Sequence, residues 1–164
     1  MSEGFSYGGA GLSTIDGKGR ATIPAELRDV VQKSSGGNHV CVARHPDLPC
    51  LIGYGRTERE QARRDIDEMR RVAIAAGQTD FDDEVIGDIA ASINETNFEA
   101  SGRFVLSQRE RHFGRLRDRV FFHGANTRFL MWDPDVFMAS APTKFKHARE
   151  ELEYLLATAG KGAK

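Results

Sequence analysis

The sequence has little that would stabilise a secreted or membrane protein. Its 164 residues include only two cysteines, too few for a disulfide framework, so we expect a protein of the reducing cytoplasm. No apolar run approaches the ~18 residues of a membrane-spanning helix, and the mean hydropathy is −0.46. The first residues lack the basic segment and apolar core of a secretory signal. These absences favour one ordinary globular domain or two small ones, with a core that needs no disulfide or metal.

The sequence also lacks an excess of charge of one sign. Its 23 lysines and arginines nearly balance 24 acidic residues, and the net charge of −1 argues against a uniformly basic nucleic-acid-binding surface. The distribution is uneven, because residues 79–99 hold seven acidic side chains and no Lys or Arg, whereas residues 101–119 hold six arginines. This change of sign near residue 100 fits a solvated surface of mixed charge or a face that meets phosphate.

The sequence also contains no recognisable set of catalytic residues. No serine–histidine–aspartate or cysteine–histidine pairing has an enzyme-like context, and the Gly-rich start lacks the Gly-Lys-Ser/Thr ending of a phosphate-binding loop. His39, Cys41, His45 and Cys50 lie within twelve residues, but their spacing is not that of a zinc finger. We favour buried thiols here, with a small metalloenzyme as a remote alternative. We therefore predict no catalytic residue, cofactor, metal or small-molecule substrate.

What the sequence does contain is an internal repeat, since residues 15–28 align with residues 98–111. The identical positions are Gly19 and Gly102, Arg20 and Arg103, and Arg28 and Arg111. Each copy continues into the same order of predicted elements: a short helix and then two apolar strands, at residues 40–43 and 50–54 after the first copy and at 120–123 and 128–132 after the second. The same order of elements twice indicates a duplicated unit.

Each copy predicts a strand, a glycine turn, a second strand, a short helix and a hairpin. Residues 16–19, Asp-Gly-Lys-Gly, are typical of a turn, because glycine adopts positive φ at low cost and Asp bonds nearby backbone. Pro24 is suited to the first turn of the helix that follows. In the second copy, Ser107 and Glu110 predict a capping box, and Gly114 predicts the end of that helix.

Helical patterns fill the remainder of the chain. Thr57 and Glu60 predict a capping box for the first helix between the copies, and Asp82 or Asp83 predicts the cap of the second. The alternating Arg and Glu residues of the first helix are more typical of a salt-bridged solvated face than of a binding site. Residues 133–134, Asp-Pro, predict the start of a short helix, after which a last amphipathic helix follows.

Taken together, these motifs resemble those of the MraZ family of bacterial proteins, which are built from two SpoVT-AbrB-type repeats. The resemblance is carried by residues 15–20, 23–24, Arg28 and 50–54 in the first copy, and by Gly102, Arg103, Arg111 and 129–133 in the second. It extends from about residue 10 to about residue 155. The second copy departs from the family pattern at Glu99, Ser101, Ser107 and Glu110, so the first copy is the better match.

The resemblance implies an α+β fold: two tandem swapped-hairpin β-barrel repeats with short helices, paired about a pseudo-twofold axis, plus two inter-repeat helices and a C-terminal helix. The division that we expect comprises a flexible N-terminus (1–9), repeat 1 (10–56), a helical connector (57–94), repeat 2 (95–138), a C-terminal helix (139–158) and a tail (159–164).

The resemblance further implies a ring-forming homo-oligomer that binds repeated promoter elements in double-stranded DNA. Its target would be the division and cell-wall gene cluster, its own operon, and its location the cytoplasm and nucleoid. The residues expected to contact DNA are Lys18, Arg20, Arg28, Arg103 and Arg111. Asp16 and Glu99 would orient the arginines through charge-assisted hydrogen bonds.

Two other interpretations stay open at the level of sequence. An Asp and an Arg four residues apart can form an internal salt bridge that fixes a hairpin without any ligand. The chain can also be a protein-interaction module, like the antitoxins that share this barrel, with the C-terminal helix and the charged central helix as the holding surfaces. The apolar helices are equally compatible with subunit contacts and with closing the core.

Overall fold

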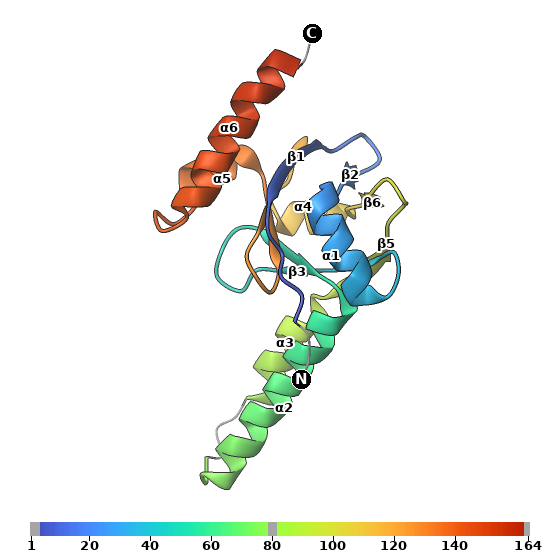
Figure 1. The fold of residues 1–164 in the computed structure, drawn as a ribbon. Helices are drawn as coiled ribbons and strands as arrows, with labels where there is room; N and C mark the ends of the chain where they lie inside the picture. Colours follow the sequence, from blue (N-terminus) through green and yellow to red (C-terminus); the bar gives the residue numbers. More distant parts are fainter. Residues whose placement is uncertain (1–3, 79–81, 163–164) are drawn as a thin grey trace.

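The structure, a computed structural model, describes residues 4–78 and 82–162. These residues form a mixed α+β fold of six helices and eight strands (Figure 1). The strands are β1 (Ala10–Thr14), β2 (Arg20–Thr22), β3 (His39–Arg44), β4 (Leu51–Tyr54), β5 (Asn94–Asn97), β6 (Arg103–Val105), β7 (Arg119–Gly124) and β8 (Phe129–Trp132). The helices are α1 (Ala25–Ser35), α2 (Arg56–Ala75), α3 (Asp83–Ala91), α4 (Gln108–Phe113), α5 (Pro134–Ser140) and α6 (Lys146–Gly162).

Strands from the two halves of the chain are interleaved in one sheet. Six antiparallel strands follow the order β1-β7-β8-β4-β3-β5, and β2 pairs with β6 in a separate two-stranded ribbon. The order is symmetric with respect to the two halves. If β1 and β5 are exchanged, and likewise β3 and β7, and β4 and β8, the same order results when the sheet is read from its other edge. The mixed α+β class is thus confirmed. The described residues form open antiparallel sheets and no closed barrel, so the swapped-hairpin β-barrel repeats stay a prediction. The pairing of β1 with β7 shows that strands of one half join those of the other.

The core lies where the central strands meet the helices that cover the sheet. Every residue of β4 and β8 is buried, as expected for strands covered on both faces. Trp132 of β8 packs edge-on against Phe137 of α5, with ring centroids 5.1 Å apart. Leu27 and Val31 on α1 are fully buried and belong to this core. None of the helices in residues 4–78 and 82–162 is long and apolar enough to span a membrane.

The helix starts were partly predictable. Ser107 accepts a hydrogen bond from the Glu110 backbone N–H at 3.1 Å and Glu110 caps the Ser107 N–H, which confirms the predicted capping box. The box predicted at Thr57 is wrong, because the cap of α2 is Gly55, two residues earlier in the chain. Glu58 accepts the Gly55 N–H at 3.0 Å, whereas the Thr57 hydroxyl donates to the carbonyl of another helix. From this start, α2 projects away from the sheet, and α3 lies beside it (Figure 1). An ion pair between Arg70 of α2 and Asp83 of α3 joins the two helices.

The N-terminal segment is attached to the sheet. Tyr7, which we expected to lie in a flexible terminus, is only 2% exposed, and its N–H donates to the Asn126 carbonyl at 2.7 Å. Its hydroxyl accepts the Gly55 N–H at 2.9 Å and donates to Glu58. At the other end, α6 continues to Gly162, into the stretch expected as a tail. The chain ends themselves, residues 1–3 and 163–164, lie outside the described residues.

Candidate functional site

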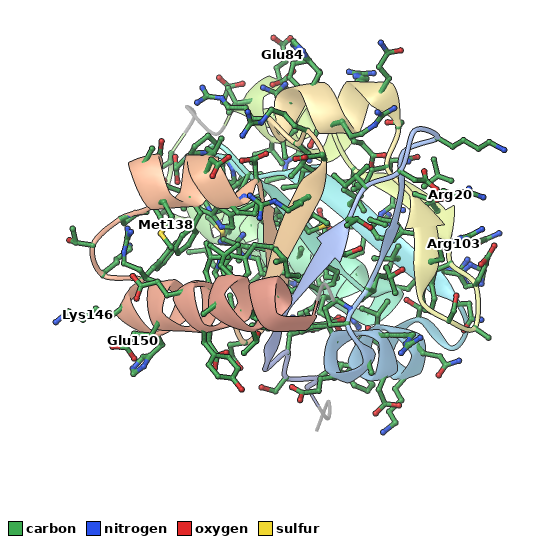
Figure 2. All side chains as sticks on the ribbon, turned by 90° about the horizontal axis from the view of Figure 1, so that it is seen from above. Arg20, Glu84, Arg103, Met138, Lys146 and Glu150 are labelled. Atoms are coloured by element: carbon green, nitrogen blue, oxygen red, sulfur yellow. The ribbon has the colours of Figure 1, made fainter. Side chains whose placement is uncertain are left out.

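The β2–β6 ribbon presents two arginines on one face. Its register pairs Arg20 with Val105 and Thr22 with Arg103. The residues between them, Ala21 and Phe104, are buried against the core. Because side chains alternate along a strand, the opposite face carries Arg20, Thr22, Arg103 and Val105, and we call it the outer ribbon face. Figure 2 shows both labelled arginines at the same edge of the molecule, on the opposite side from the labelled residues of α6.

Two similar glycine turns lead into the ribbon strands. The Gly19 N–H donates to the Asp16 carbonyl at 2.9 Å, and the Gly102 N–H donates to the Glu99 carbonyl at 2.7 Å. Both glycines have positive φ, +80° and +91°, a region that favours glycine. Each turn therefore places an arginine at the first position of its strand.

The first turn holds its arginine tightly. The Asp16 carboxylate accepts the Arg20 Nε–H at 2.6 Å, while its other oxygen accepts the backbone N–H groups of Arg20 and Lys18, each at 2.9 Å. The backbone N–H of Arg20, followed by its guanidinium, lowers the pKa of the Asp16 carboxyl to about 2. No other described residue bonds the two terminal nitrogens of Arg20. The Arg20 side chain is 32% exposed.

The second turn is looser. Arg103 Nε lies 3.5 Å from the Glu99 carboxylate, and the Arg103 side chain is 43% exposed. Glutamate carries one more methylene than the aspartate of the first turn, so its carboxylate is less firmly tied to its own turn. Lys18 is exposed at the tip of the first turn, whereas the second turn has Ser101 there. The structure thus brings two acid–arginine pairs to one edge, one of them more rigid than the other.

The two helix arginines each brace a glycine turn. Arg28 on α1 donates from Nη1 to the Ala100 carbonyl at 3.1 Å, in the turn of the other half. Arg111 on α4 donates from Nε to the Leu106 carbonyl at 3.1 Å and lies beside Gly19. The repeat predicts DNA contacts for both residues and does not indicate these bonds. The Arg28 bond in particular depends on how the halves cross, because its acceptor lies in the other half.

Replacing Arg28 by alanine tests this role. The Arg28→Ala variant is expected to lower the free energy of unfolding by about 1 kcal/mol, the typical net value of one hydrogen bond. The measurement is urea unfolding of the variant beside Arg63→Ala, which removes an exposed arginine from α2. Equal stabilities for these two variants would contradict a bracing role.

Further arginines flank the ribbon, and sequence analysis did not select them. The Arg44 guanidinium lies over the Phe113 ring at 3.9 Å from its centroid, and the Arg109 guanidinium lies 5.9 Å from the same ring. Arg115 follows at the end of α4. Among the described residues none of these three arginines has an ion-pair partner. We call them the α4 flank. Arg109 and Arg115 belong to the cluster of arginines after residue 100, which the sequence shows. No sequence pattern indicates Arg44, which lies on β3.

The residues of the zinc alternative do not converge. His39 Nδ1 lies 2.7 Å from the Asn97 side-chain oxygen, and His45 Nδ1 accepts two backbone N–H groups of its own loop at 3.0 Å. Burial raises the pKa of the Cys41 thiol, and raises that of Cys50 to about 12. Within the part of the chain that the structure describes, no three His, Cys, Asp or Glu residues are grouped to hold a metal. The four side chains of the zinc alternative thus lie in separate environments and do not form a common ligand set in the described structure.

Comparison with curated proteins gives a consistent result, although no protein-family model matches the chain. The "Transcriptional regulator MraZ" of Paraburkholderia xenovorans (strain LB400) is 30% identical over 133 residues, 81% of this chain and 86% of that protein. Its namesake from Pseudomonas syringae pv. tomato (strain ATCC BAA-871 / DC3000) is 30% identical over 142 residues, 82% of this chain and 85% of that protein. These relatives are named as regulators and not as enzymes. The chain belongs to the MraZ family of transcriptional regulators.

Proposed function

We propose that this protein is a DNA-binding transcription regulator that inserts its outer ribbon face into the major groove. The observation that carries the proposal is the projection of Arg20 and Arg103 from one face of a two-stranded ribbon whose other face is buried. The major groove of B-DNA admits a two-stranded β-ribbon, and it is the groove in which all base pairs are distinguishable.

Arg20 has the geometry for reading a base. Asp16 binds its Nε and fixes the side chain, so the terminal nitrogens stay available for the O6 and N7 acceptors of guanine. Arg103 would read a second base from the same ribbon with a less restrained side chain. Lys18, exposed at the turn, would contact a phosphate. Because Arg28 and Arg111 each donate to a backbone carbonyl, any phosphate contact would use their remaining N–H groups.

The α4 flank would supply additional phosphate contacts. Its arginines are exposed and have no ion-pair partner in the described residues, so their charge is not neutralised within the protein. Two residues separate α4 from β6, so Arg109 follows the ribbon closely along the chain, and Arg44 lies at the same Phe113 ring as Arg109. A local basic surface of this kind reconciles phosphate binding with a net charge of −1.

The finer targets follow from the family. We infer that the chain binds repeated promoter elements upstream of the division and cell-wall gene cluster, its own operon, in the cytoplasm and at the nucleoid. A single ribbon makes few contacts, so a ring-like homo-oligomer that engages several repeats would raise the avidity without new contacts.

An Arg20→Ala variant tests the proposed function. Its affinity for DNA from upstream of its own gene is expected to be ten- to a hundredfold lower, because a bidentate arginine–guanine contact contributes ~1–3 kcal/mol of discrimination. Fluorescence anisotropy at two salt concentrations measures this, beside Arg63→Ala, which removes an exposed arginine of α2. Wild-type affinity should fall steeply with salt. Unchanged affinity of Arg20→Ala, with Arg63→Ala also unchanged, would refute the proposal.

A further inference from the structure

An exposed apolar side chain lies between the two ribbon arginines. Val105 is 48% exposed on β6. The other large hydrophobic side chains exposed in the described residues, Met69, Val72, Ile74, Val85 and Tyr154, all lie on helices. Among them, Val105 is therefore the one presented by a strand, on the face that carries the arginines.

The register fixes the neighbours of Val105. It stands directly opposite Arg20 on the paired strand and two residues after Arg103 on its own strand. Directly opposite side chains in an antiparallel pair have Cβ atoms ~5 Å apart. A ligand that engages Arg20 would therefore also meet the isopropyl group of Val105.

From this juxtaposition we propose that Val105 recognises the 5-methyl group of a thymine next to the base read by Arg20. The inference rests on the proposed function, because it needs the outer ribbon face to enter the major groove. Valine has no donor or acceptor, so it can recognise only an apolar feature. In the major groove of unmodified DNA the thymine methyl group is the one methyl group at a base edge, since cytosine has only a C5–H at that position and the remaining edge groups that distinguish the base pairs are hydrogen-bond donors or acceptors.

The other side of the ribbon lacks this apolar group. Thr22 takes the equivalent place opposite Arg103, and it carries a hydroxyl with one methyl where Val105 carries two methyls. Its position is fixed by the backbone, because the Thr22 N–H donates to the Ser13 hydroxyl at 2.9 Å. The two arginines thus have different neighbours.

Replacing single thymines by uracil tests this proposal, because uracil lacks only the 5-methyl group. In DNA from upstream of the gene, substitution at one thymine position per bound element is expected to weaken wild-type binding about fourfold, the loss for one methyl-sized group at ~0.8 kcal/mol. Val105→Ala should bind thymine and uracil DNA equally at that position. Val85→Ala, which truncates an exposed valine on α3, should retain the wild-type difference.

The outcomes separate the two proposals. If wild-type binding depends on Arg20 but no uracil substitution weakens it, or if Val105→Ala keeps the uracil effect, the assignment of Val105 is overturned and the DNA-binding function stands. If the wild-type protein does not bind this DNA, both proposals fall. Circular dichroism of Val105→Ala, expected to match the wild type because the residue is half exposed, excludes misfolding as a cause.

Discussion

Replacing either turn glycine, Gly19 or Gly102, by alanine is expected to lower the free energy of unfolding by about 3 kcal/mol. An alanine at positive φ costs about 1–2 kcal/mol in its own backbone. Its Cβ would also come 2.5 Å from the Leu106 carbonyl at the first turn, or 2.7 Å from the Ile23 carbonyl at the second. To avoid this overlap the turn must move, which weakens the backbone hydrogen bond that each glycine carbonyl accepts from the other half, worth about 1 kcal/mol.

Gly17 provides the matched control. It lies in the same turn as Gly19, but its φ is not positive and a Cβ there would have no neighbour within 4 Å. Urea unfolding should therefore find Gly17→Ala within about 0.5 kcal/mol of the wild type. If Gly19→Ala and Gly17→Ala proved equally stable, the close packing of the two turns described above would be refuted.

Acidification is expected to remove about 3 kcal/mol of stability through one histidine. His123 is only 7% exposed, its Nε2 has no hydrogen-bond partner, and it packs among Phe121, Phe137 and Phe145. This burial lowers the pKa of His123 to about 4 from its ordinary value of 6.5. Between these two values the unfolded chain binds the proton and the folded chain does not. The contribution of the neutral His123 to the free energy of unfolding is therefore fully present above pH 6.5. It decreases as the pH falls towards 4 and is lost below that pH.

A His123→Leu variant isolates this contribution. Leucine has a similar volume and does not titrate, so the free energy of unfolding of this variant should change between pH 7.5 and pH 4.5 by about 2.5 kcal/mol less than that of the wild type. His147→Leu, at an exposed position on α6, should behave like the wild type. The assignment to His123 is excluded if His123→Leu and the wild type lose the same stability on acidification.

Local chemistry made much of the secondary structure predictable. The strand predicted at residues 40–43 lies within β3, and the one at 120–123 lies within β7. Asp133 caps α5 through two backbone N–H groups, as the Asp-Pro pair indicated. The error at α2 arose because any Ser or Thr three residues before Glu fits the capping pattern, whereas Glu58 had a glycine as its partner.

The arrangement of the halves was less accessible to sequence reasoning. Two copies of a pattern specify two similar units, but the pattern does not say whether β1 pairs within its own half or with β7 of the other. For the same reason the sequence does not reveal the hydrogen bond of Arg28, because its acceptor, the Ala100 carbonyl, lies 72 positions further along the chain. Tyr7 was missed because one aromatic residue in a Gly-rich segment has no periodicity. The arginines of the turns were predictable because an Asp four residues before an Arg, with a glycine between them, can form a turn and an ion pair within a single short segment.

The interleaved sheet has a consequence for how this chain holds together. The ribbon takes one strand from each half, and the outermost strands β1 and β5 are bonded to partners from opposite halves of the chain. A cut between residues 75 and 83 would therefore not release two finished modules. Each fragment would be left with severed pairings and an exposed apolar surface. We therefore expect the whole duplicated chain, and not each half, to be the smallest cooperative folding unit.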